Sequence, residues 1–118
     1  MAHEKIGIST HVLDIARGKP AAGIPVQLER CEAPEHWQKV GAGRTDHDGR
    51  CEHLLPASVD LAPGTYRLIF HIASYHSQLG ADALHPVVQI TFLVRDGEKH
   101  LHLPLLLSPN GYTTYRGS

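Results

Sequence analysis

The sequence has no long hydrophobic run and no excess of charge of either sign. Its longest strongly apolar stretch, residues 103–107, contains Pro104 and is far too short to span a bilayer. Eleven Lys and Arg residues balance twelve Asp and Glu residues, which leaves a formal charge of −1. This balance excludes the basic footprint with which proteins bind nucleic acid or an anionic membrane surface.

Cysteine is nearly absent as well, since the chain has only Cys31 and Cys51. Two cysteines do not make the disulfide framework of a small secreted domain. Residues 1–5 lead directly into a strand-like segment, without an apolar stretch of signal-peptide length. We therefore expect a cytoplasmic protein with two reduced thiols. The sequence alone leaves a single bridge between them open.

Length and composition indicate a single globular domain over residues 1–118. Hydrophobic residues make up 42% of the chain and charged residues 19%, which separates it from disordered sequences. A chain of 118 residues is long enough for one ordinary domain and too short for two. Any binding partner must therefore be inferred from individual sites.

Turn residues recur at short intervals, and the segments between them have strand length and strand patterning. We predict one short helix over residues 74–79 and eight strands, over residues 6–14, 24–31, 37–45, 50–54, 65–73, 87–94, 100–107 and 112–116. Many short strands with at most one helix predict an all-β fold, an antiparallel sandwich or barrel.

His11 is predicted to face away from the core. In the strand over residues 6–14, Ile8 and Val12 share one face, and alternation places His11 on the other. An outward histidine is usually a solvated side chain. Taken alone, His11 is therefore only weak evidence for a site.

His100 and His102 share one face of the strand over residues 100–107. Residues two apart on a strand lie about 7 Å apart, so both rings can reach one ligand. A His-x-His pair of this kind is a workable pair of zinc ligands, for which Cys51, His53 and His71 are candidate partners. Two outward polar residues over a Leu-rich inner face are the simpler interpretation.

Arg50 and the last residues are two further candidates. Arg50 follows a turn at residues 46–49, where an arginine is either a solvated charge or a clamp for a developing oxyanion. Residues 112–118 are strand-like up to Ser118, whereas chain ends are normally disordered unless something holds them. We expect this tail to belong to an interface or a site.

Together these segments resemble the 5-hydroxyisourate hydrolases, also called transthyretin-related proteins. The motifs that carry the resemblance are Ser-Thr-His-Val-Leu-Asp at residues 9–14, Gly-Arg-Thr-x-x-Asp-Gly-Arg at 43–50, His-x-His-x-Pro-Leu-Leu-Leu-Ser-Pro at 100–109 and Tyr-x-Thr-Tyr-Arg-Gly-Ser at 112–118. The closing Tyr-Arg-Gly-Ser is the most specific, because hormone-carrying transthyretins lack it. His76 departs from the pattern, since the family tends to have aromatic residues there.

The resemblance implies a transthyretin/prealbumin-like sandwich of two four-stranded antiparallel sheets with one short helix. It also implies that His11, Arg50 and His102 form the catalytic group, with Tyr115 contacting substrate and the tail to Ser118 shaping the pocket floor. Family members are homotetramers, dimers of dimers, whose sites lie in the channel between dimers. No cofactor and no metal are implied.

The implied reaction is hydrolytic ring opening of 5-hydroxyisourate, a purine-derived small molecule on the route from urate to allantoin. A neutral imidazole accepts a proton from water near pH 7, and Arg50 would stabilise the developing oxyanion. The sequence does not decide whether His11 or His102 is the base. The competing interpretations are a non-catalytic carrier, a zinc protein and an inert sandwich module. The carrier is disfavoured, because an apolar ligand tunnel has no need of two bases and a guanidinium.

Overall fold

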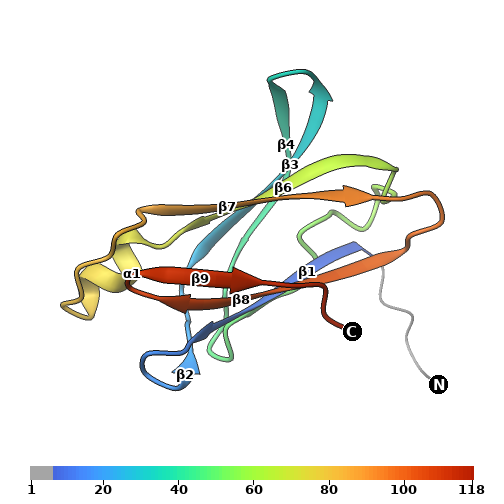
Figure 1. Ribbon diagram of the computed structural model, residues 1–118. Helices are drawn as coiled ribbons and strands as arrows, with labels where there is room; N and C mark the ends of the chain where they lie inside the picture. The colour runs from blue at the N-terminus through green and yellow to red at the C-terminus, as the bar shows by residue number, and fades with distance from the viewer. Residues whose placement is uncertain (1–6) are drawn as a thin grey trace, which may run out of the picture.

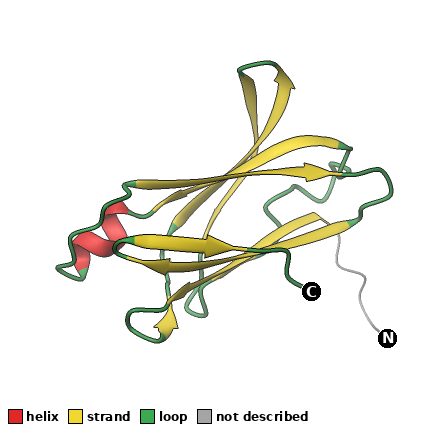
Figure 2. Ribbon diagram, in the orientation of Figure 1, coloured by secondary structure: helices red, strands yellow, loops and turns green. Residues whose placement is uncertain are grey.

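The computed structural model describes residues 7–118, which form two β-sheets packed face to face and one short helix (Figure 1). The helix, α1 (Ala73–Gln78), lies at one end of the sandwich (Figure 2). The strands are β1 (Gly7–Asp14), β2 (Lys19–Pro20), β3 (Pro25–Ala33), β4 (His36–Arg44), β5 (Arg50–Cys51), β6 (Gly64–His71), β7 (Val87–Val94), β8 (His100–Ser108) and β9 (Gly111–Thr114). The predicted all-β sandwich with one helix is confirmed.

The two sheets differ in their strand directions. The second sheet, in the order β4-β3-β6-β7, has four antiparallel strands, as expected. The first sheet, in the order β2-β1-β8-β9 with β5 also paired to β1, has five strands, and β1 runs parallel to β8. The expectation of a purely antiparallel first sheet is therefore corrected. Side-chain alternation is the same in both arrangements, so the sequence pattern could not reveal this parallel pair.

Several predicted boundaries also shift. The strand expected over residues 50–54 ends at Cys51, since His53 adopts a left-handed backbone conformation with φ of 60°. The last strand, expected over 112–116, covers Gly111–Thr114, and Gly117 then forms an isolated bridge with His102. Lys19–Pro20, which lie outside all eight predicted strands, form the short edge strand β2.

The core lies between the two sheets and fixes which face of β1 and β8 points outward. Ile8 and Val12 of β1 are at most 1% exposed, and Leu105 and Leu107 of β8 are completely buried. Burial of such a side chain contributes about 1.5–3 kcal/mol. A one-residue slip of either strand would expose this whole set, so the register is strongly specified.

Two features bear on the earlier expectations for cysteine and membranes. Cys31 and Cys51 are both free thiols, and burial raises the pKa of the Cys51 thiol. No helix in the described part of the chain is long and apolar enough to cross a membrane.

Candidate active site

The register of β1 places His11 between two other strands. On one side its partner is Arg50 of β5, and on the other it is Pro104 of β8. His11 is partly buried, whereas Val12 beside it is completely buried, so the predicted outward face is confirmed. Paired residues share a face of the sheet, and the structure therefore brings His11 and Arg50 to the same outer surface.

The turn before β5 fixes the position of Arg50. One carboxylate oxygen of Asp46, Oδ1, accepts the backbone N–H groups of Arg50 and Asp48, each at 2.9 Å. These bonds, that from Arg50 foremost, hold the pKa of the Asp46 carboxyl below its ordinary value. Gly49 has a φ of 76°, and a Cβ on it would lie 2.3 Å from the Val12 carbonyl oxygen. Only glycine fits this close approach.

His11 is oriented by the same turn. Its Nε2 lies 2.8 Å from the backbone carbonyl oxygen of Asp48. A carbonyl oxygen can only accept a hydrogen bond, so Nε2 must carry the proton. In the neutral ring the lone pair is then on Nδ1, which makes Nδ1 the atom able to accept a proton from water.

His102 is held by groups from β1 and from the tail. Its Nδ1 lies 2.8 Å from the hydroxyl oxygen of Ser9, its register partner, and the same oxygen lies 3.1 Å from Nε2 of His100. The two imidazole rings are nearly parallel, with an interplanar angle of 12°. Ser9 was not predicted as a site residue. The shared face of Ser9 and His11 was visible in the sequence, but the pairing of β1 with β8 was not.

The tail passes directly over His102. The Gly117 backbone N–H donates to the His102 carbonyl oxygen at 2.8 Å. Arg116 makes a two-pronged ion pair with Glu98, with N–O distances of 3.0 and 2.8 Å. Tyr115 is 53% exposed, and Ser118 is also exposed. The burial of these two residues therefore gives no evidence that either one packs against a histidine ring.

The zinc interpretation finds no third ligand beside His100 and His102 among the described residues. Cys51 pairs with the core-facing Thr10 and so lies on the opposite face of the sheet. His71 belongs to the second sheet, where its Nε2 lies 2.6 Å from the Gln27 side-chain oxygen.

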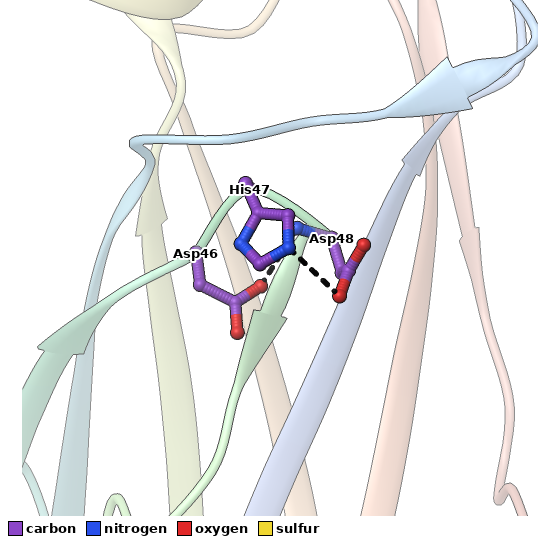
Figure 3. Close-up of side chains that lie close together, drawn as sticks. All are labelled: Asp46, His47 and Asp48. Atoms are coloured by element: carbon purple, nitrogen blue, oxygen red, sulfur yellow. Dashed lines mark hydrogen bonds and ion pairs between the residues drawn. The ribbon is translucent and has the colours of Figure 1, made fainter.

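Residues 7–118 contain one cluster with metal-ligand geometry, formed by Asp46, His47 and Asp48 (Figure 3). All three side chains are exposed, and His47 Nε2 lies 3.3 Å from a carboxylate oxygen of Asp48. The Asp46 oxygen that shapes the turn already accepts two backbone hydrogen bonds. We therefore attribute the closeness of these three side chains to the turn that positions Arg50.

Two hollows of the described structure lie away from His11, Arg50 and His102. One, of about 390 Å³, lies near α1 and is lined by residues including Ser77 and Asp82. Another, of about 340 Å³, lies along β7 and β8 beside Leu101. Neither is lined by the three candidate residues.

Chemically, the face combines two imidazoles with one guanidinium. Imidazole exchanges protons near neutral pH, and guanidinium stays charged and presents forked donors to an anion. Groups of these types are able to act as a base, an acid and a stabiliser for a developing negative charge.

Three comparisons place the chain among known proteins. Residues 8–117 match the model of the HIUase/Transthyretin family. The 5-hydroxyisourate hydrolase of Mus musculus is 44% identical over 119 residues, with both chains fully covered. The structure of Klebsiella pneumoniae 5-hydroxyisourate hydrolase matches with a TM-score of 0.81 and 33% identity, covering 98% of this chain and all of the other.

Sea bream transthyretin in complex with thyroxine has a TM-score of 0.85 and 29% identity, with 93% of each chain covered. Because a hydrolase and a transthyretin match the backbone about equally well, the fold alone does not separate catalysis from carriage. The separation depends on the side chains of the outer face.

Proposed function

Because this chain belongs to the HIUase/Transthyretin family, as its sequence resemblance predicted, we propose that it catalyses the hydrolytic ring opening of 5-hydroxyisourate. The observation that carries the proposal is the register of β1, which brings His11 opposite Arg50 and Ser9 opposite His102 on one outer face. A carrier of an apolar ligand has no use for two titratable rings and a guanidinium at one surface. A hydrolase of a cyclic amide needs all three.

In the proposed mechanism one imidazole takes a proton from water as the water attacks the amide carbonyl carbon. The guanidinium of Arg50 holds the substrate oxygen, on which negative charge develops. The second imidazole gives a proton to the leaving nitrogen as the ring C–N bond breaks. His11 and His102 fill these two roles. No cofactor or metal takes part in the proposed steps.

Tyr115 and Ser118 are proposed to contact the substrate. The Gly117 N–H bond to the His102 carbonyl holds the tail next to the ring, and the ion pair of Arg116 with Glu98 secures it from the other side. Both residues that flank this anchored segment then lie at the edge of the site. Their exposure in a single chain leaves them accessible to a ligand.

We further propose that the active form is a homotetramer, a dimer of dimers, with the sites in the channel between dimers. The pairing of the strands supports it. Within residues 7–118, the edge strands β7 and β9 each pair with only one neighbour. Unpaired strand edges are ready to bind another chain. Sedimentation velocity should give a species of four times the 12.9 kDa chain mass, and a monomer that is fully active would contradict this proposal.

The proposed activity is tested by following the ultraviolet absorbance of freshly generated 5-hydroxyisourate with and without the protein. We expect decay much faster than the spontaneous reaction, with loss of the acceleration in Arg50→Glu while the fold and assembly are kept. Thyroxine titration in parallel tests the carrier alternative. Tight thyroxine binding without acceleration would replace the hydrolase proposal with that of a carrier.

A further inference from the structure

Ser9 lies between His100 and His102 in a set of hydrogen bonds that the proposed mechanism does not use. Its hydroxyl oxygen is 2.8 Å from Nδ1 of His102 and 3.1 Å from Nε2 of His100. Ser9 is only 7% exposed and sits on β1, opposite His102 on β8.

A serine hydroxyl has a single proton, so it can donate to only one of the two rings. If Ser9 donates to His102, the proton of the neutral His102 ring is on Nε2 and the ring is a donor there. If Ser9 instead accepts from His102, the His102 proton is on Nδ1 and Nε2 is a base.

The proposed mechanism selects the first of these arrangements. The Asp48 carbonyl accepts a hydrogen bond from His11 Nε2, which leaves the His11 Nδ1 lone pair as the base. The second imidazole is then the proton donor, and this role calls for a proton on Nε2 of His102.

We propose that Ser9 is a positioning residue that fixes His102 as the Nε2–H tautomer, with His100 donating to Ser9 and thereby setting the direction of its hydroxyl. His11 is then the base that takes a proton from the attacking water, and His102 gives its Nε2 proton to the leaving nitrogen. A proton that passes from His11 to His102 through solvent restores both neutral rings, so one water is consumed in each turnover. The choice of tautomer rests on the proposed hydrolase function, whereas the tautomer itself is measured on the protein alone.

The first test is independent of activity. Nitrogen-15 NMR of histidine-labelled protein, at a pH where the rings are neutral, distinguishes protonated from unprotonated ring nitrogens. We expect His102 of the intact protein to be protonated at Nε2, and Ser9→Ala to give a mixture of tautomers. Protonation of His102 at Nδ1 in the intact protein would overturn the proposal, whatever the enzyme assay shows.

The second test uses kinetics. Ser9→Ala should lower kcat on the order of tenfold or more with little change in KM, because Arg50 still binds the substrate. Ser9→Thr keeps the hydroxyl and should restore most of the rate. Ser108→Ala on the same strand as His102 is the matched control, since the Ser108 hydroxyl donates only to the Gly111 carbonyl. Equal kcat in Ser9→Ala and Ser108→Ala would overturn the proposal.

If the intact protein shows the expected tautomer but does not accelerate 5-hydroxyisourate decay, the proposed function fails and the role of Ser9 in fixing the ring remains. If the protein is active and the tautomer does not respond to Ser9→Ala, the positioning role fails and the function remains. The two outcomes are thus separable.

Discussion

Gly117 lies against the ring of His102 with no room for a side chain between them. A Cβ on Gly117 would be 2.7 Å from Cδ2 of His102 and 3.1 Å from Cγ of Pro104. Its backbone N–H also donates to the His102 carbonyl oxygen. The tail therefore approaches the ring this closely only because residue 117 is glycine.

Gly117→Ala should therefore lower turnover by at least tenfold with little loss of stability, because either the ring or the tail must move and small displacements of catalytic groups are costly. Gly111→Ala is the matched control, since its added Cβ would meet nothing within 4 Å. Steady-state rates and thermal melting of both variants check the prediction. Equal rates in the two variants would contradict it.

Arg50 is expected to act through its guanidinium alone. Its backbone N–H donates a hydrogen bond to Asp46 Oδ1, and its side chain is exposed. Because the turn uses only the backbone of residue 50, Arg50→Gln should leave the turn intact. We expect kcat to fall by about 100- to 1,000-fold, the usual effect of removing one oxyanion donor. Arg44→Gln, on the exposed surface of the second sheet, should keep nearly full activity. A comparable loss in both variants would point to a general charge effect.

Asp46 should contribute an acid-dependent part of the stability. Its pKa is lowered in the folded protein, so its stabilising effect is present above the ordinary value of 3.8 and is lost as the pH falls through the lower, folded value. Asp46→Asn should therefore be less stable than the parent protein near neutral pH and equally stable well below pH 3.8. Urea unfolding at both pH values measures this. A stability difference that does not change with pH would contradict it.

His76 of α1 is expected to be a stability cost. It is 1% exposed, and its Nε2 has no hydrogen-bond partner among residues 7–118. His76→Leu should raise the free energy of unfolding by about 1 kcal/mol, because an unsatisfied buried polar atom is removed. Tyr75→Phe is an opposite control. It breaks the 2.7 Å bond from the Tyr75 hydroxyl to buried Asp14 and should destabilise by about 1 kcal/mol. Urea unfolding of both variants measures the change in the free energy of unfolding. A lower value for His76→Leu than for the parent protein would contradict the prediction.

The sequence predicted the outward faces of β1 and β8, because alternation of Ile8, Val12 and Leu105 against polar residues follows from burial alone. It also predicted the helix and most of the strands. It could not predict that β1 and β8 run in parallel, since alternation carries no direction. The contact of Ser9 with His102 depends on that pairing, and this is why Ser9 escaped notice.

The turn before β5 shows the same limit. The Asp-x-x-Gly pattern at residues 46–49 indicated a turn, but not the carbonyl of Asp48 that orients His11. Such backbone groups have no sequence signature, because every residue carries the same carbonyl. Glu98 was missed for a related reason, since an exposed carboxylate is ordinary until the partner Arg116 lies beside it.

The most direct measurement compares the decay rate of 5-hydroxyisourate with equal folded concentrations of the parent protein and of His102→Ala. We predict strong acceleration by the parent protein and a loss of at least 100-fold in the variant, the usual contribution of a positioned acid or base. Unchanged acceleration in His102→Ala would contradict the assignment of this face as the site of catalysis.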